Sequence, residues 1–223
     1  MNLPFTPEQF LSVFARYNER VWPMQLGLNL MALVCIGLLF HRGVWASRGI
    51  CMILSLLWAW MAIAYHFAFF SDINPAAWAF GAVFLLESMA LARFGVVRTD
   101  VLLRPVPGVR AWVGAALIVF ALVLYPLIGY SVGHRYSYAP TFGLPCPTTI
   151  FTLGLLLFSV RPVSGWVFVI PLLWAVVGSS AAFQLGMVED LGLLAAGVAT
   201  LAVMLFSPAT SYRGTAGDGA ARG

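Results

Sequence analysis

The sequence predicts an all-α membrane protein: a bundle of transmembrane helices with one amphipathic helix at its N-terminal end. Apolar residues make up 61% of the chain and charged residues only 9%, so water alone cannot solvate the surface of the folded protein. Apolar runs of about 20 residues recur along the chain, and a helix of that length crosses a hydrocarbon layer of roughly 30 Å. Most of the charged residues lie between these runs.

The first element expected is a short helix over residues 6–20. Thr6 can cap this helix, and Pro7 fits its first turn. Its apolar face is formed by residues spaced three or four apart: Phe10, Val13, Phe14, Tyr17 and Val21. We therefore assign residues 1–20 to an amphipathic helix in the plane of the membrane interface. Packing of the same helix against the outer end of the bundle is the alternative.

Seven transmembrane spans are expected within residues 21–206. They are Val21–Phe40, Gly49–Phe70, Pro75–Val97, Ala111–Tyr130, Thr141–Val160, Val163–Phe183 and Leu191–Phe206. The fifth is marginal, because only 14 residues separate Cys146 from Arg161, and a helix that crosses the bilayer must begin as early as Thr141. Six spans with a re-entrant or short fifth segment are the alternative. Residues 207–223 form a polar, glycine-rich tail that is expected to be disordered and cytoplasmic.

The distribution of arginines predicts the orientation of the bundle. No lysine occurs, and nine of the twelve basic residues fall on one side of the expected spans: Arg42, Arg48, Arg93, Arg98, Arg104, Arg110, Arg161, Arg213 and Arg222. The other side has three arginines and five acids: Arg16, Arg20, Arg135, Glu8, Glu19, Asp72, Glu189 and Asp190. Because cytoplasmic loops carry the excess of basic residues, we expect the N-terminus outside and the C-terminus in the cytoplasm.

Several functions are excluded by composition and motif. The absence of lysine excludes a retinal Schiff base, and scattered arginines give no nucleic-acid signal. The chain has no P-loop, GxSxG, HExxH or EF-hand motif, so no cofactor is expected and no enzyme signature is present. Three cysteines provide no disulfide framework.

Two proline phrases mark helix starts that are expected to face the same outer compartment. Asn74 precedes Pro75, and Cys146 precedes Pro147, so each helix would expose the free N–H groups of its first turn. Thr148 and Thr149 would add hydroxyl groups to the second helix start. Such helix ends hold electronegative groups in transporters, although the same pattern also simply begins a helix.

Two ionisable residues are expected at membrane depth. Glu87 is the single acid well inside a span, where an acid is costly and is a functional hypothesis by default. It can carry a proton or bind a cation, or it can be a protonated structural residue. His66 lies about one turn below the outer end of its helix, roughly 10–12 Å from the depth of Glu87, so a direct pair is not expected. His66, His134 and Cys146 are weak candidates for a metal site, because no ligand spacing supports one.

Four phrases carry a resemblance to a known family: "PFTPEQFLSVFARYN", "YHFAFFSDINPAAWAFGA", "APTFGLPCPTTIFTLG" and "GSSAAFQLG…DLGLL". They resemble an uncharacterised bacterial family of small multi-pass membrane proteins, known only as a domain of unknown function. The resemblance implies an integral protein of a bacterial inner (cytoplasmic) membrane and implies no activity. Some members of the family are loosely labelled permeases.

Three functions remain open from the sequence. The first is a permease for a small solute or ion, with Glu87 deep in the path below an outward-facing vestibule. The vestibule residues would be His66, Asn74, Tyr136, Tyr138, Cys146, Thr148 and Thr149. The second is a structural or accessory subunit of a membrane complex. The third is a membrane-embedded metal or redox enzyme that uses Cys146, His66 and His134. The expected partners are the lipid bilayer and a small solute or ion, and the sequence does not decide between protein partners and a homo-oligomer.

Overall fold

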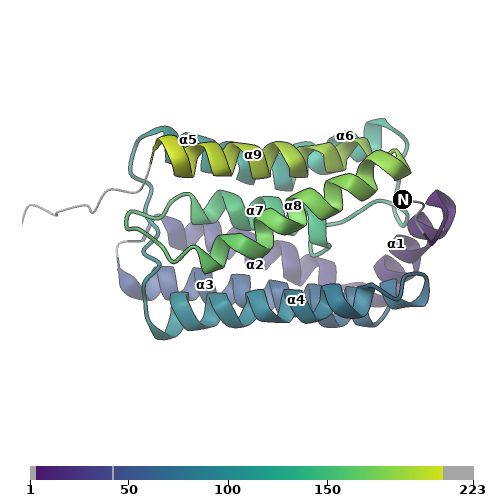
Figure 1. Ribbon diagram of the computed structural model, residues 1–223, viewed down its shortest axis with the longest axis horizontal. Helices are drawn as coiled ribbons and strands as arrows, with labels where there is room; N and C mark the ends of the chain where they lie inside the picture. The colour runs from purple at the N-terminus through teal and green to yellow at the C-terminus, as the bar shows by residue number, and fades with distance from the viewer. Residues whose placement is uncertain (1–3, 42, 208–223) are drawn as a thin grey trace, which may run out of the picture.

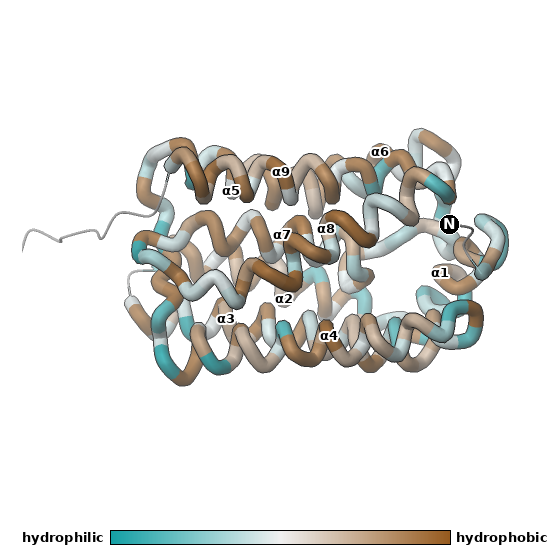
Figure 2. The backbone as a smooth tube through the Cα atoms, viewed as in Figure 1, coloured by the Kyte–Doolittle hydropathy of each residue, from teal (hydrophilic) through white to brown (hydrophobic). Residues whose placement is uncertain are grey.

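The computed structural model describes residues 4–41 and 43–207, and in this part of the chain every regular element is a helix (Figure 1). The helices run back and forth along one axis of the molecule, which confirms the predicted all-α bundle. Apolar residues cover the middle of the bundle, and polar residues gather toward its two ends (Figure 2). This pattern is that of a protein surrounded by lipid at its middle and by water at its ends.

Five helical segments of the described chain are long and apolar enough to cross a membrane. The first, Val44–Asp72, comprises α3 (Val44–Trp60), η1 (Met61–Phe67) and η2 (Phe70–Asp72). The second, Ala77–Val97, comprises α4 (Ala77–Ala90) and η3 (Leu91–Val97), and the third, Val109–Ser131, comprises α5 (Val109–Val119), η4 (Phe120–Leu124) and α6 (Tyr125–Ser131). The last two are α8 (Trp166–Leu185) and Val188–Phe206, which comprises η5 (Val188–Asp190) and α9 (Leu191–Phe206). A sixth is added if the bent pair α1 and α2 is one span.

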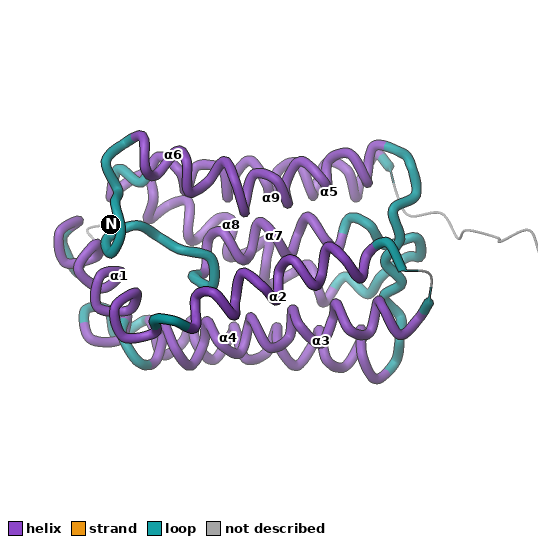
Figure 3. The backbone as a smooth tube through the Cα atoms, turned by 180° about the vertical axis from the view of Figure 1, so that it is seen from behind, coloured by secondary structure: helices purple, strands orange, loops and turns teal. Residues whose placement is uncertain are grey.

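The first helix, α1 (Pro7–Val21), begins where the sequence predicts. Thr6 caps it, and the Gln9 side chain accepts a hydrogen bond from the Thr6 N–H group in return. The helix is bent by 88° from α2 (Met24–Leu39), so it lies across one end of the bundle (Figure 3). Its apolar face is buried, and the Trp60 indole donates a 2.7 Å hydrogen bond to the Tyr17 hydroxyl. α1 therefore packs on the bundle through the face expected to be apolar.

The fifth predicted span takes the short form. Its helix, α7 (Pro145–Leu156), has 12 residues, and nearly every one of them is buried among the other helices. At its far end, the chain continues through turns to the end of the bundle, where the N–H group of Val160 donates to the Leu102 carbonyl over 2.9 Å. Two glycines, Gly114 and Gly154, let α5 and α7 approach closely, because a Cβ on Gly114 would lie 2.7 Å from the Gly154 carbonyl oxygen. A full-length helix over Thr141–Val160 is therefore not what the chain forms.

The two ends of the bundle differ in charge. At one end, which we call the arginine end, Ser47 bonds to Leu103, Leu103 bridges to Ser159, and Arg110 donates to the Ser207 carbonyl. This end collects the described arginines of the predicted cytoplasmic side: Arg48, Arg93, Arg98, Arg104, Arg110 and Arg161. The opposite end, which we call the α1 end, carries α1 and the loop after α6. Arg42, Arg213, Arg222 and the predicted tail from residue 208 onward lie outside the described residues.

Candidate functional site

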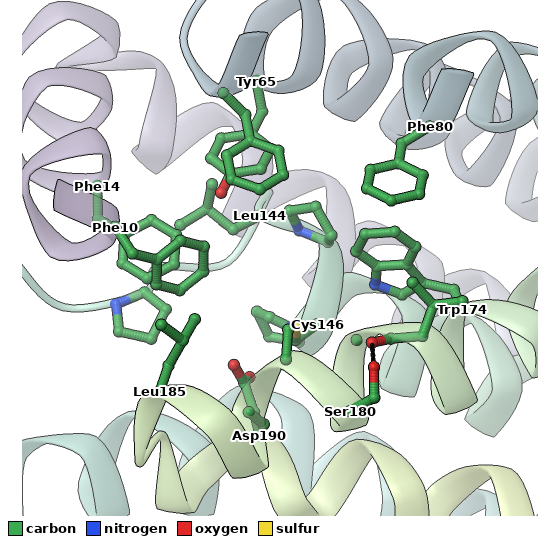
Figure 4. Close-up of a pocket in the computed structure, with 18 of the residues that line it drawn as sticks. Phe10, Phe14, Tyr65, Phe80, Leu144, Cys146, Trp174, Ser180, Leu185 and Asp190 are labelled. Carbon is green, nitrogen blue, oxygen red and sulfur yellow. Dashed lines mark hydrogen bonds between the residues drawn. The ribbon is translucent and has the colours of Figure 1, made fainter. Parts of the chain in front are cut away.

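A cavity of about 130 Å³ lies at the α1 end, between α1, the N-terminus of α7 and the second half of α8 (Figure 4). Aromatic side chains form much of its wall: Phe5, Phe10, Phe14, Tyr65, Phe70, Phe80, Tyr125 and Trp174. The apolar lining also includes aliphatic residues and three prolines: Leu144, Val177, Ala181, Ala182, Leu185, Pro140, Pro145 and Pro147. An apolar cavity of about 150 Å³ is large enough for benzene, so this cavity has room for a ligand of a few heavy atoms.

Asp190 is the charged group of the cavity. It is only 3% exposed, and its carboxylate accepts a hydrogen bond from the Tyr125 hydroxyl. The Cys146 side chain, from the first turn of α7, lies beside the same carboxylate (Figure 4). Although Asp190 sits at the N-cap position of α9, its side chain makes no cap hydrogen bond to the described residues of that helix. The carboxylate is therefore directed into the cavity instead of onto its own helix.

The preceding residue, Glu189, is a second buried acid. It is 0% exposed, and its Oε1 atom lies 2.6 Å from Nδ1 of His134 in the loop after α6. The Oε2 atom of Glu189 has no hydrogen-bond partner within the described chain. Among the described residues, no ion pair joins Asp190 to any basic side chain, so only one of the two neighbouring acids has a basic partner.

Asn74 and Cys146, the residues of the two proline phrases, both line this cavity. The free N–H groups expected there are largely absent from these described helix starts, which corrects the predicted geometry. The Asn74 side chain accepts a 3.1 Å hydrogen bond from the Ala76 N–H group, and α4 begins only at Ala77. α7 begins at Pro145, so two of its first three residues are prolines, which have no N–H group. The charge of the cavity comes from the Asp190 carboxylate, and Asn74 and Ser180 add uncharged polar groups to its lining.

His66 lies directly behind the aromatic wall of the cavity. Its ring centroid is 5.4 Å from that of Trp174 and 4.6 Å from that of Phe84. His66 is 0% exposed, and neither ring nitrogen has a hydrogen-bond partner among the described residues. Glu87, one turn of α4 beyond Phe84, is also 0% exposed, and the described chain offers no partner to either of its carboxylate oxygens. Neither residue lines the cavity, so both lie deeper in the bundle.

The other predicted vestibule residues do not line the cavity either. Tyr136 and Tyr138 are 60% and 54% exposed on the loop after α6. The Thr148 hydroxyl accepts a 3.0 Å hydrogen bond from the Gly143 N–H group and so closes the turn into α7. Thr149 is buried, and its hydroxyl has no hydrogen-bond partner in the described part of the protein. Two of the eight candidates, Asn74 and Cys146, thus meet at the cavity.

The three weak metal candidates are not brought together. His134 contacts Glu189, Cys146 lies beside Asp190, and His66 is separated from both by the aromatic wall. Within residues 4–41 and 43–207, no three histidine, cysteine, aspartate or glutamate side chains form a group that could hold a metal ion.

Three groups that shape the cavity were not predicted as site residues: Tyr125, Trp174 and Asp190. The sequence places Asp190 on the outer side, together with Glu8, Glu19 and Asp72, but does not distinguish a buried acid from an exposed one. Two adjacent acids directly before a long apolar helix are the sequence feature that sets Glu189 and Asp190 apart from the other outer acids.

Comparison with known proteins identifies one family. A family model described as "Family of unknown function (DUF6064)" matches residues 7–214. Neither a curated protein nor a solved structure matches the chain.

Proposed function

The chain belongs to the DUF6064 family of unknown function, and we propose that it is a permease-like membrane protein that admits a small solute from the α1 end. The observation that carries the proposal is the cavity of about 130 Å³ with the Asp190 carboxylate in its wall. Apolar cavities with a few convergent polar groups are the usual form of a small-molecule site. A buried acid at the end of a membrane bundle is expensive unless it has such a use.

The excess of arginines at the arginine end supports an orientation with that end in the cytoplasm. In this orientation, the cavity opens toward the outside of a bacterial inner membrane. α1 would then lie in the outer interface, because it is bent by 88° from α2 and lies across the end of the bundle.

Two irregular helical segments position the cavity tyrosines. Tyr65 lies within the π-helical segment η1, and Tyr125 directly follows the π-helical segment η4. Because a π-helical turn inserts an extra residue, it rotates the side chains that follow it, and such turns are common at functional sites. Both segments would allow a small change in helix geometry next to the ligand.

The route inward from the cavity would pass the aromatic wall and reach two deeper polar side chains. His66 and Glu87 are both buried without hydrogen-bond partners in the described chain, and each costs free energy that a structural role does not explain. A solute, a proton or ordered water in this region would supply the missing partners. The metal or redox enzyme has less support, because its three candidate residues lie apart.

Thiol labelling tests the proposed access. In a variant with Cys35→Ala and Cys51→Ala, Cys146 is the remaining thiol, since the chain has three cysteines. We expect a small membrane-impermeant methanethiosulfonate reagent, added to intact cells, to label Cys146 slowly. A Tyr138→Cys variant that also lacks Cys146 is the positive control, because position 138 is exposed at the same end. A variant that retains only the fully buried Cys51 is the negative control.

Filling the cavity distinguishes access through it from general mobility of the chain. We expect Ala181→Phe, which places a ring among the cavity residues, to abolish the labelling of Cys146 and leave that of the Tyr138→Cys control unchanged. If Cys146 stays unlabelled while the Tyr138→Cys control reacts, the cavity is not reached from the outside, and the proposal is wrong.

A further inference from the structure

On the basis of the proposed function, we infer that the solute is a small organic cation, an alkylammonium group that sits against the aromatic wall and is neutralised by Asp190. This inference rests on the cavity being a ligand site and adds the chemical class of the ligand. It depends on three features: the charge balance at the cavity, the nature of its wall and the absence of a basic side chain from its described lining.

The charge balance favours a positive ligand. Glu189 and Asp190 are both buried, and His134 is the one basic side chain that contacts either of them within the described chain. A buried carboxylate without a cationic partner is strongly disfavoured. A bound cation would supply the missing charge at Asp190, while His134 remains with Glu189.

The wall favours a cation that carries an apolar body. Tyr65 stacks on Phe70 with ring centroids 5.6 Å apart, and Phe80 meets Trp174 edge-on at 5.4 Å. Aromatic faces attract ammonium groups, and cages of such rings recognise quaternary ammonium ligands. Hard metal cations instead need several oxygen ligands, whereas this wall is mainly aromatic and aliphatic carbon.

The absence of a basic side chain from the described lining argues against an anion. Among the described residues, no arginine or histidine lines the cavity, and the prolines at positions 145 and 147 remove backbone donors from the first turn of α7. An anion would also lie close to the Asp190 carboxylate. The volume of about 130 Å³ limits the ligand to roughly the size of benzene.

The test compares two probes of similar compact shape on the purified full-length protein in detergent. Tetramethylammonium carries a permanent charge, and tert-butanol carries none. Thermal unfolding is followed at increasing probe concentration, with sodium chloride added to keep the ionic strength equal. Because a ligand that binds only the folded state raises the unfolding temperature, we expect a saturable rise with tetramethylammonium and a clearly weaker effect of tert-butanol. This comparison needs no variant.

Two variants locate the charge. Asp190→Asn keeps the size of the side chain and can still accept a hydrogen bond from Tyr125, and we expect it to weaken tetramethylammonium binding by about tenfold or more. Asp72→Asn removes an acid at the same end of the bundle whose side chain is 52% exposed, and it should bind as the unaltered protein does.

Two results would overturn the inference, and they have different meanings. If tert-butanol binds as tightly as tetramethylammonium, and Asp190→Asn changes neither, the ligand is not a cation, but the cavity remains a ligand site. If neither probe shifts the unfolding temperature of the unaltered protein, while thiol labelling still shows access to Cys146, the ligand class is wrong and the proposed access stands.

Discussion

His134 Nδ1 lies 2.6 Å from Oε1 of Glu189, and this contact joins the loop after α6 to the turn that begins α9. The glutamate is fully buried, whereas 18% of the histidine side chain is exposed. The contact therefore places a basic group against the residue next to Asp190. It fixes the position of the cavity carboxylate, because Glu189 and Asp190 share one short turn.

His134→Ala should destabilise the protein by about 2–4 kcal/mol, because it leaves Glu189 buried without its partner. Thermal unfolding in detergent measures the change. Arg16→Ala is the matched control, since the Arg16–Asp72 pair is about half exposed and should cost at most about 1 kcal/mol. The double variant His134→Gln with Glu189→Gln should lose less than the two single changes together. Strict additivity would show that the two residues do not interact.

Asn18→Ala should cost about 2–4 kcal/mol, because Asn18 uses all of its hydrogen-bonding capacity. Its amide donates to the carbonyls of Ser137 and Ala139, and its oxygen accepts from Gln25 at 2.6 Å and Thr141 at 2.8 Å. Asn18→Asp keeps the shape but loses both donated bonds, so we expect a similar loss of stability in thermal unfolding. The control is Asn29→Ala, which removes one bond at an exposed position and should change stability by less than about 1 kcal/mol. An Asn18→Asp variant as stable as the original protein would contradict the described contacts.

Gly114→Ala should destabilise the protein by about 1–3 kcal/mol through steric overlap. A methyl group there would lie 2.7 Å from the Gly154 carbonyl oxygen and 2.8 Å from the Phe158 ring, so α5 and α7 must separate. Gly37→Ala is the control, because no atom of the described residues lies within 4 Å of its added Cβ, and it should be neutral or slightly stabilising. Equal unfolding temperatures for the two variants would rule out a close α5–α7 contact.

Glu87→Met should raise the stability of the protein by about 1–3 kcal/mol, because it replaces a buried acid that has no partner in the described chain with an apolar side chain of similar length. Under the proposed function, the same change should abolish transport, measured as uptake of radiolabelled solute into vesicles. Leu86→Met, at a position 54% exposed on the outside of the bundle, should leave both properties unchanged. A loss of stability in Glu87→Met would mean that Glu87 has a structural partner.

The C-terminal end of α9 should lie in the cytoplasm, because it shares the arginine end of the bundle. A green fluorescent protein fused to the C-terminus is expected to fluoresce, and an alkaline phosphatase fused at the same place should be inactive. The reverse pattern would invert the orientation and place the cavity on the cytoplasmic side.

The sequence predicts the helical segments well and the site only in part. Helix boundaries such as Thr6–Pro7 follow from local chemistry, namely the cap and the proline in the first turn. The break before α7 is also visible, because two prolines precede a run too short to cross the bilayer. The cavity is less predictable, because its wall combines residues from α1, η1, α7, α8 and η5 whose spacing in the chain carries no common pattern. The expectation of free N–H groups at the start of α7 was wrong because the helix begins at Pro145, two residues before Pro147, so its first turn contains two prolines.

Hydropathy and charge along the chain are enough to predict a helical membrane bundle with one basic end. Both are properties of successive residues and do not depend on how the helices pack. Which polar groups are buried, in contrast, depends on how the helices pack. Asp72 and Asp190 belong to the same end and have the same chemistry, yet the side chain of Asp72 is 52% exposed and Asp190 is 3% exposed. That difference arises because α6, α7 and α8 pack around Asp190, and burial depends on distant segments meeting in space.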